Sequence, residues 1–538
     1  MVLGVKSLNE KDGKTTKNKV GGGRPVIWAG LFLVLMLFMS VANIKLLLNP
    51  IKQYTAEEID FKGLTAVVHD TYVEDFLGKY YFVNINGAYM GFTGKRIVNG
   101  VIKLNNGMLT DASMPERDIE PLADNIIAFS NYLAEQDIPF LYVQAPFKID
   151  NNNLLLPAGR SSEVNISVDS LLTELSTSNV NALDLRSYIS ETPEMLERYF
   201  NKTDHHWNYT GAFVAFQQIV EDIQNILPEK KLDLTYADME QWESHLLKNW
   251  FLGSRGKRVG MFFTGVDDIV YYTPKFTTYM SCAISKHSWL YKGDFADANI
   301  RSEYLDRVDY FGDNPYCLYI GGDYPLVQHR NDKAPNDLKI LIIKDSFNLP
   351  VQAYMSTLFK EVDVIDPRHF TECSVVEYVQ YNKPDMVIMM INPSQFGGKA
   401  YHDFGVANVN INKIFEEKLI LNESEIKLPA KDNNYNYAIV ADNLQYGKTY
   451  AIRFNDVDFM QGESNGVTVS LYNPVEQTIF ATRIFDVEYC RQNGRFEWIF
   501  NTPASGHGDL QLLLYSGLWR ATAGVSSIYT NISLSRLD

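Results

Sequence analysis

Leu338-Lys339-Ile340-Leu341-Ile342-Ile343-Lys344-Asp345-Ser346 begins as an almost continuous apolar run and ends in a hydroxyl group. Such a run predicts a strand that is buried on both faces, as in a parallel sheet. The next residues, from Phe347 to Phe359, carry Pro350 near their start and apolar residues at helical spacing, which predicts a helix. Ser346 is therefore predicted at a strand-to-helix turn, where backbone N–H groups face a developing oxyanion.

A second stretch, Asp204-His205-His206-Trp207, supplies the groups that a nucleophilic serine needs. A base must take the hydroxyl proton, and a carboxylate must orient the base. His206 and Asp204 can fill these two roles for Ser346. The alternative is structural, with Asp345-Ser346 forming a tight turn and Asp204 and a histidine capping a helix that starts near Asn208. Spacing alone leaves both interpretations open.

The segment from Thr203 to Ala212, Thr-Asp-His-His-Trp-Asn-Tyr-Thr-Gly-Ala, resembles the signature of the DHHW proteins. These are relatives of the periplasmic alginate O-acetyltransferases within the SGNH-hydrolase-like superfamily. In that group the Asp and His precede the nucleophilic Ser, a permuted order relative to ordinary SGNH esterases, and the order here matches. Lys344 departs from the pattern, because SGNH esterases usually have Gly before Asp-Ser. Three further stretches carry the resemblance: Leu252–Gly260 with Gly265–Asp268, Val364–Phe370, and Pro384–Ile388.

The resemblance implies an O-acetyltransferase that modifies a cell-surface or secreted polysaccharide through an acyl-serine at Ser346. His206 would act as the general base, and Asp204 would hold its tautomer. It also implies a membrane-bound O-acyltransferase partner that passes the acetyl group across the membrane. A polysaccharide acetylesterase would use the same triad, and a non-catalytic, anchored carbohydrate-binding scaffold is a third alternative.

Four further residues are candidates for contacts with the substrate or the oxyanion. Arg368 would bind an anionic acceptor or support the oxyanion, or else it forms a salt bridge with nearby acids. Asn392 follows an apolar strand where SGNH enzymes carry an oxyanion Asn, although Asn-Pro-Ser is not their Gly-x-Asn pattern. Gly253 and Arg255 belong to a basic, Gly-rich loop that either covers the cleft or forms a surface turn.

The remaining candidates support the triad from behind. His205 and Asp345 are expected next to the reacting groups, and Trp207 is expected to pack beneath them. Two imidazoles and a carboxylate would also suit zinc or manganese. Adjacent histidines on a loop seldom converge without a further ligand, and no HExxH-like spacing is present. We therefore expect no metal at this site.

The N-terminus predicts a single-pass membrane protein. Residues 1–24 form a basic arm that is expected to be disordered and cytoplasmic, and residues 25–48 form an apolar anchor in which Lys45 reaches the headgroups. Acidic residues follow the span, which predicts that the bulk of the chain lies outside. The alternative is a signal peptide cleaved after Ser40-Val41-Ala42. Outside the cytoplasm, ATP and free acetyl-CoA are not plausible cofactors, so none is expected.

Length and composition predict two folded domains after the anchor. The chain has 538 residues with 46% hydrophobic content, enough for sizeable cores, and its net charge of −16 argues against a nucleic-acid surface. Residues 49–110 are expected to connect the anchor to the catalytic domain, with a β-rich stretch at Tyr80–Ile85. Residues 111–425 alternate strands with helices, including a helix over 116–135, which predicts an SGNH-hydrolase-like, doubly wound parallel α/β sheet. The predicted strands of this sheet are Phe140–Val143, Val180–Leu185, Ile340–Ile343, Val362–Ile365 and Met386–Ile391.

The pattern changes after a polar linker at Lys427–Asn434. Residues 435–538 contain short strands without helices, which predicts a β-sandwich of the jelly-roll kind. Such a module could bind carbohydrate, with Trp519 or Tyr472 stacking on a sugar ring, or these aromatic side chains could belong to its core. The predicted strands are Thr449–Phe454, Val467–Tyr472, Thr478–Phe485, Phe496–Phe500, Leu510–Tyr515 and Ser527–Ser533.

Overall fold

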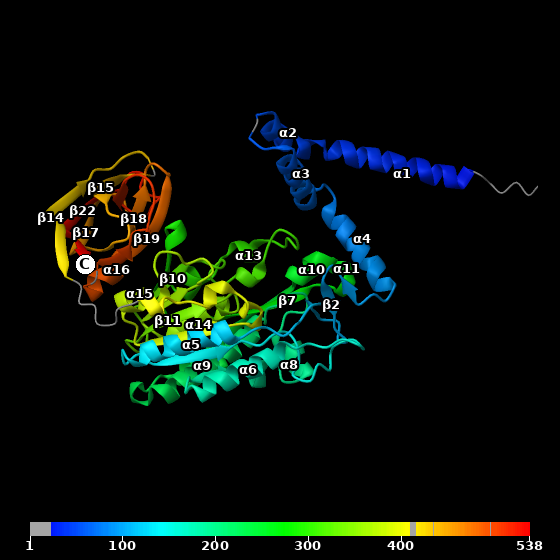
Figure 1. Ribbon diagram of the computed structural model, residues 1–538, viewed down its shortest axis with the longest axis horizontal. Helices are drawn as coiled ribbons and strands as arrows, with labels where there is room; N and C mark the ends of the chain where they lie inside the picture. Colours follow the sequence, from blue (N-terminus) through cyan, green and yellow to red (C-terminus); the bar gives the residue numbers. More distant parts are fainter. Residues whose placement is uncertain (1–22, 57, 409–415, 434, 495, 538) are drawn as a thin grey trace, which may run out of the picture. The chain divides into compact units, whose positions relative to one another are not determined.

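The computed structural model describes residues 23–56, 58–408, 416–433, 435–494 and 496–537 (Figure 1). The chain divides into two compact units, Met1–Val83 and Asn84–Asp538. The basic arm predicted at residues 1–24 lies almost entirely outside the described residues. The two units are described separately below.

The first unit is helical. It contains α1 (Gly23–Ala42), the 3-10 helix η1 (Ile44–Leu47), α2 (Leu48–Thr55) and α3 (Phe61–Asp75). Among the described residues, no single helix is both long and apolar enough to cross a membrane. The segments Ala29–Ala42 and Ile44–Thr55, which meet at 43°, satisfy length and hydropathy criteria only as a bent pair. The anchor at residues 25–48 therefore stays a prediction.

The predicted β-rich stretch at Tyr80–Ile85 is wrong, because these residues lie in helix α4 (Lys79–Phe92). Within the second unit, the Asn84 side chain accepts a hydrogen bond from the Met261 backbone N–H at 2.8 Å. Gly87 packs so closely that a Cβ there would lie 2.1 Å from the Val259 carbonyl oxygen. Aromatic content favoured a strand, but the segment satisfies its backbone hydrogen bonds within itself as a helix.

The second unit is built around an eight-stranded mixed sheet with the order β5-β4-β13-β11-β12-β10-β8-β9. Its first five strands are parallel, as predicted: β5 (Ala182–Asp184), β4 (Phe140–Gln144), β13 (Met386–Ile391), β11 (Lys339–Lys344) and β12 (Glu361–Ile365). The prediction of a purely parallel sheet is wrong, because three antiparallel strands extend it beyond β12. They are β10 (Leu326–Asn331), β8 (Met280–Ile284) and β9 (Trp289–Gly293). Polar residues interrupt the apolar pattern of β10 and β9, and β8 is only five residues long.

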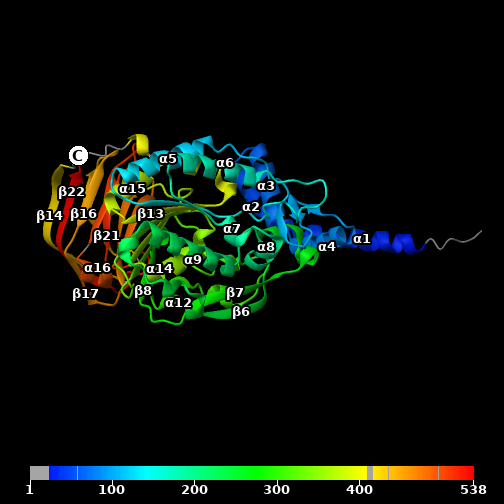
Figure 2. The same ribbon diagram turned by 90° about the horizontal axis from the view of Figure 1, so that it is seen from below.

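Helices cover both faces of this sheet, so the doubly wound arrangement is confirmed. Residues alternate along β11, with Ile340 and Ile342 in one apolar core and Leu341 and Ile343 in the other. The first core contains α9 (Tyr209–Ile226) and α14 (Asn348–Leu358), and the second contains α5 (Glu120–Ala134), α6 (Val164–Thr177) and α15 (Val375–Asn382). In Figure 2, α5 and α6 lie on one side of β13 while α9 and α14 lie on the other. Burial on both faces explains the continuous apolar runs in these strands.

Smaller elements complete the α/β domain near the site. The strands β1 (Ile97–Val98), β2 (Val101–Lys103) and β3 (Leu109–Asp111) form a three-stranded antiparallel sheet. The strands β6 (Trp242–Phe251) and β7 (Asp267–Pro274) form an antiparallel pair. The connection between them contains the short helices α10 (Ser254–Val259) and α11 (Met261–Thr264). The helix α8 (Pro193–Tyr199) precedes the Asp204 loop and packs against α9.

The C-terminal region is an antiparallel β-sandwich with its own apolar core. One sheet has the order β14-β22-β16-β20, with β17 also paired to β22, and the other has the order β15-β21-β18-β19. Leaving β17 aside, this order is that of a jelly roll, and all six predicted strands are present. The strands are β14 (Glu417–Leu428), β15 (Tyr437–Leu444), β16 (Thr449–Arg453), β17 (Asp456–Gln461), β18 (Gly466–Asn473), β19 (Thr478–Asp486), β20 (Glu497–Asn501), β21 (Leu510–Tyr515) and β22 (Ser526–Leu537).

The sandwich begins before the predicted boundary at residue 435. The strand β14 pairs along most of its length with β22, so its residues belong to the sandwich and not to the catalytic domain or a linker. Its exposed, charged face concealed the strand, because only Leu428 at its end is fully buried. Trp519 and Tyr472 are half-buried, with the Arg520 guanidinium 4.4 Å from the Trp519 ring, and their contact with sugar stays a prediction.

A fragment of residues 416–538 is expected to melt cooperatively at a higher temperature than a fragment of residues 435–538. Without β14, one edge of the long strand β22 is left unpaired and the core loses Leu428. Circular dichroism melting of both fragments measures the difference. Equal melting temperatures would show that β14 is not an integral strand of the sandwich.

Candidate active site

Ser346 lies where the sequence predicts it, between the end of β11 at Lys344 and the start of α14 at Asn348. Its side chain is half-buried, and the Tyr316 hydroxyl donates a hydrogen bond to its carbonyl at 3.2 Å. Among the described residues, no group accepts a hydrogen bond from the Ser346 backbone N–H. That N–H, at the positive end of α14, is therefore available to an oxyanion formed at the serine.

The structure brings Ser346, His206 and Asp204 into one hydrogen-bonded chain. The Ser346 Oγ lies 2.7 Å from His206 Nε2, and His206 Nδ1 lies 2.6 Å from Asp204 Oδ1. Because an ionised carboxylate can only accept, the proton of the neutral ring lies on Nδ1. The Nε2 atom is then free to accept the serine proton, which is the arrangement of a serine-histidine-aspartate triad.

Asp204 is buried, and its carboxylate accepts several hydrogen bonds from neighbouring protein groups. Its Oδ2 accepts hydrogen bonds from the Ser254 backbone N–H at 2.6 Å and from the Ser254 hydroxyl at 2.7 Å. Burial by itself raises the pKa of Asp204, but the electrostatic interactions with His205 and His206, strongest when either ring takes up a proton, outweigh it and hold the pKa well below the ordinary value. The carboxylate therefore stays ionised and keeps the His206 ring oriented.

Two buried charged residues, Lys148 and Asp267, hold the backbone of the Asp204 loop through hydrogen bonds. The Lys148 ammonium donates to the carbonyl oxygens of Asn201, of Lys202 at 3.1 Å and of Asp204 at 2.6 Å. The Asp267 carboxylate accepts from the Thr203 backbone N–H at 2.8 Å and from the Thr203 hydroxyl. Burial lowers the pKa of Lys148 to about 7, even though Asp267 and Asp204 oppose the shift. These contacts leave the loop little freedom to turn Asp204 away from His206.

Gly253 contributes to the site through close packing. A Cβ on Gly253 would lie 2.4 Å from the Asp204 Cβ and 2.5 Å from its backbone nitrogen, so no larger residue fits. The segment that follows is helix α10, in which Gly256 and Val259 are buried. The segment predicted as a Gly-rich loop or surface turn is thus a short helix, because the glycines allow α10 to pack directly against the Asp204 loop. Its covering of the cleft stays a prediction.

Aromatic side chains hold the His206 ring on two sides. Tyr316 stacks on it with the ring centroids 3.9 Å apart and the planes at 9°, and Phe347 lies 4.9 Å away. Trp207 is fully buried, and its Nε1 donates to the Phe347 carbonyl at 3.0 Å. Trp207 thus packs beneath the site, as predicted, and fixes the residue that follows Ser346.

His205 and Arg255 form a side branch of the site and do not contact Ser346. His205 Nδ1 lies 3.1 Å from the Ser254 Oγ and 2.9 Å from an Arg255 Nη. Because Arg255 can only donate, this nitrogen of His205 accepts, and the ring is neutral. Burial, and the repulsion that two protonated rings would feel beside His206, lower the pKa of His205 to about 4. Arg255 is in turn paired with Asp111, at 2.5 Å.

Lys344, which replaces the usual Gly, is fully buried in a cluster at the carboxyl ends of β11 and β12. Its ammonium pairs with Asp323 and lies 3.1 Å from Asp366. Arg368 pairs with the same two acids, at 2.6 Å from Asp366 and 3.1 Å from Asp323. Burial opposes the charge on Lys344, but the two carboxylates raise its pKa above the ordinary value. Of the two roles considered for Arg368, the structure shows the salt bridge.

Asn392 is also engaged in structural contacts. Its side-chain amide donates to the Pro146 carbonyl at 2.7 Å, and its Oδ1 accepts from the Ser394 backbone N–H at 3.0 Å. Asp345 accepts from the backbone N–H groups of Asn392 at 2.8 Å and Phe347 at 2.9 Å. Burial raises the pKa of Asp345 to about 6, against these hydrogen bonds. Asn392 therefore positions the loop after β13 and does not point its amide at Ser346.

Asp204, His205 and His206 also form the group of potential metal ligands, whose donor atoms lie within 4.8 Å of one another. Within the described part of the chain, each of these atoms already takes part in a hydrogen bond of the triad or its side branch. The hydrogen bonds of the triad therefore account for the positions of these atoms without a metal ion. The expected absence of a metal stays a prediction.

Several residues at the site were not identified from the sequence. Lys148 follows β4 at the same end of the sheet as Ser346, a position that could have identified it. Asp267 and Ser254 lie in stretches that carried the family resemblance, but neither has a motif of its own. Tyr316 lies in the short 3-10 helix η6 (Pro315–Cys317) and Asp323 in an irregular loop, and no spacing pattern connects either residue to the triad.

The fold and the site define an SGNH-hydrolase-like α/β domain with a permuted triad. Residues 106–258 match the family model of the SGNH hydrolase-like domain, acetyltransferase AlgX, so the resemblance noted in the sequence is confirmed. This match contains Asp204 and His206 and ends before Ser346. No curated protein matches the chain at the significance threshold.

Several solved structures are similar to the chain. PatB1 of Bacillus cereus is 22% identical, over 56% of this chain and 99% of its own, with a TM-score of 0.49. A DHHW family protein of Eubacterium siraeum is 19% identical, over 59% of this chain and 98% of its own, with a TM-score of 0.42. AlgX of Pseudomonas aeruginosa is 13% identical, over 81% of this chain and 94% of its own, with a TM-score of 0.36.

Replacing Lys148 by Met should lower the free energy of unfolding by about 2–4 kcal/mol, because buried carbonyl oxygens of the Asp204 loop lose their donor. The matched control is Lys275→Met, since Lys275 also donates to a carbonyl oxygen, that of Glu240 at 2.8 Å, but on the surface. The control should change by less than about 0.5 kcal/mol. Denaturant unfolding of both variants measures the difference, and equal losses would contradict a special role for the buried ammonium.

His205 is expected to make the fold less stable in acid. Its pKa is about 4 in the folded protein and 6.5 ordinarily, so between these values the unfolded chain binds more protons. The free energy of unfolding therefore falls as the pH falls from 6.5 to 4, by an amount on the order of 2 kcal/mol. His205→Asn should show a shallower fall in this window and the same slope as the wild type above pH 7. Parallel curves throughout would contradict this assignment.

Proposed function

We propose that this protein is an extracytoplasmic O-acetyltransferase that modifies a polysaccharide through an acyl-Ser346 intermediate. The observation that carries the proposal is the hydrogen-bonded chain from Ser346 through His206 to Asp204 at the N-terminus of α14. The match of residues 106–258 to an acetyltransferase domain supports acetyl as the transferred group. The route uses only groups of the chain itself and needs no cofactor.

In the first half-reaction, the Ser346 Oγ attacks the carbonyl carbon of the acetyl donor while His206 Nε2 takes the hydroxyl proton. The negative charge that develops on the carbonyl oxygen faces the Ser346 backbone N–H and the positive end of α14. Asp204 stabilises the imidazolium through Nδ1. His206 then returns the proton to the leaving oxygen of the donor, the donor's ester bond breaks, and acetyl-Ser346 remains.

In the second half-reaction, a sugar hydroxyl attacks the acetyl carbon and His206 takes its proton. The new ester bond forms as the bond to Ser346 breaks, and the proton returns from His206 to the serine oxygen. Water in place of the sugar would give free acetate by the same steps, as in an acetylesterase. The outcome depends on how well the sugar is held and water excluded at the half-buried serine.

We further propose that residues 25–48 anchor the protein in the cell membrane, with its N-terminus in the cytoplasm. The basic residues before this segment and the acidic residues after it support this orientation. A membrane-bound O-acyltransferase would then supply the acetyl group from across the membrane. A polysaccharide outside the membrane would accept it.

Ser346→Ala is expected to lower acetyl transfer from a surrogate aryl acetate by at least about 1,000-fold, because no other group can carry the acyl intermediate. Mass spectrometry of the wild type after mixing with the surrogate should show one acetyl group on Ser346. The matched control is Ser254→Ala, which removes a hydroxyl that contacts Asp204 but no reacting atom, and it should retain the acetylated intermediate. Near-normal turnover by folded Ser346→Ala protein would rule out the covalent route.

The same assay separates the alternative functions when an oligosaccharide acceptor is added. Acetylated sugar formed at the expense of free acetate supports transfer, whereas acetate alone supports an esterase. A folded wild-type protein that forms no acyl-serine and does not react with a fluorophosphonate would support a non-catalytic scaffold.

A further inference from the structure

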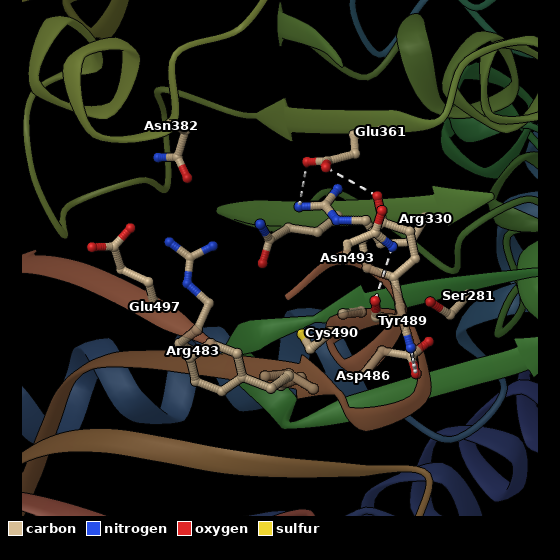
Figure 3. A pocket seen from close by; sticks show the side chains of 14 residues that line it. Ser281, Arg330, Glu361, Asn382, Arg483, Asp486, Tyr489, Cys490, Asn493 and Glu497 are labelled. Carbon is tan, nitrogen blue, oxygen red and sulfur yellow. Dashed lines mark hydrogen bonds and ion pairs between the residues drawn. The ribbon is translucent and has the colours of Figure 1, made fainter. Parts of the chain in front are cut away.

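A cavity of about 80 Å³ lies within the second unit, between the α/β domain and the sandwich (Figure 3). Strands β8, β10 and β12 contribute one wall, while β19, β20 and helix α16 (Val487–Asn493) contribute the other. Glu361, which lines it, is the first residue of β12 and pairs with Lys339 at the start of β11. Ser346 follows the opposite end of β11, so this cavity is separate from the candidate active site.

Every carboxylate that lines the cavity already has a cation as partner. Glu361 lies 3.6 Å from Arg330, which also pairs with Asp363 at 2.7 Å. The other two lining acids are likewise paired, Asp486 with Lys292 at 2.7 Å and Glu497 with Arg453 at 2.5 Å. Each lining carboxylate is therefore held by a cation other than Arg483, although each of these cations is shared with a second acid.

Arg483 of β19 is the exception among the charged lining residues. It is 7% exposed, and its Nε has no hydrogen-bond partner. Among the residues that the structure describes, its guanidinium forms no ion pair. In Figure 3 the guanidinium points toward the space between Glu497 and Asn382, with no interaction drawn to it. An unpaired, buried guanidinium is costly, and a bound anion would offset that cost.

The positive charge of Arg483 also acts on two acids that do not line the cavity, Glu372 and Asp363. Burial raises the pKa of Glu372 to about 7, although the positive charge of Arg483 opposes this shift. Glu372 is not within ion-pair distance of the guanidinium and does not neutralise it by direct contact. Arg483 lies on β19, the edge strand of one sheet of the sandwich, and β20 is the edge strand of the other sheet. At this position the N–H groups of the guanidinium are open to a ligand.

We propose that this cavity is a binding site for a carboxylate, held by the guanidinium of Arg483. A carboxylate matches the planar guanidinium of an arginine with two parallel hydrogen bonds, and it would give the Arg483 guanidinium the partner that it lacks. The amide side chains of Asn382, Asn493 and Gln328 also line the cavity. The carboxylate comes either from a free small acid or from an acidic sugar residue, since both present the same group.

The test measures binding of acetate and of D-glucuronate to the full-length protein by isothermal titration calorimetry, with D-glucose as the uncharged control. Both carboxylates, or one of them, should bind the wild type, and Arg483→Gln should weaken the binding at least about tenfold. Binding of acetate alone identifies a free small acid as the source, and preference for glucuronate over acetate identifies an acidic sugar. Bound carboxylate should also raise the melting temperature of the wild type but not of Arg483→Gln.

Three controls make the result specific. Arg491→Gln removes an arginine on neighbouring α16 that is paired with Asp456 and Asp458, and it should bind like the wild type. Arg483→Lys keeps the charge but loses the fork, so it should bind more weakly than the wild type. Ser346→Ala should bind unchanged, which separates this site from the proposed catalysis. Unchanged binding by Arg483→Gln, or no saturable binding of either carboxylate by the wild type, would overturn the proposal.

Discussion

The carboxylate of Asp204 is the interaction on which the candidate site depends. One of its oxygens accepts from His206 and the other accepts from Ser254, so it joins the loop before α9 to helix α10. Through the His206 ring, the carboxylate is also connected to Ser346, which follows β11. Three segments that are distant in sequence thus share one buried negative charge. That charge is tolerable because hydrogen bonds and Lys148, beneath the loop, compensate it.

Charge compensation distinguishes the two polar regions of the α/β domain. At the carboxyl ends of the parallel strands, Lys344 and Arg368 face Asp323 and Asp366, so the buried cations and anions balance. Such a cluster holds the strand ends in place next to Ser346 without adding net charge there. At the opposite end of the sheet, the lining acids are paired and Arg483 is left over. The proposed carboxylate would give Arg483 the missing partner, whereas the cluster around Lys344 is complete without a ligand.

Much of the catalytic domain could be predicted from local patterns, and the misses have physical causes. The strands β4, β11, β12 and β13 were identified because strands buried on both faces are continuously apolar. The edge strands β9 and β14 were not, since their exposed or polar faces remove that signal, and β8 was missed because it is only five residues long. At Tyr80–Ile85 the aromatic residues favoured a strand, but the segment lies in helix α4, which satisfies its backbone hydrogen bonds within itself.

The amino-acid sequence by itself determined the order of the triad residues, the strand-to-helix turn at Ser346 and the change from an α/β pattern to a sandwich. Each of these is encoded by residues that are adjacent in the chain, through hydrophobic period and turn chemistry. Only the tertiary structure decided which polar residues meet: Tyr316 against His206, Lys148 beneath Asp204, and Arg368 in a salt bridge. These contacts join residues far apart in the chain, and the folded geometry selects among many equally polar partners. The pairing of these residues therefore cannot be predicted from a local sequence pattern.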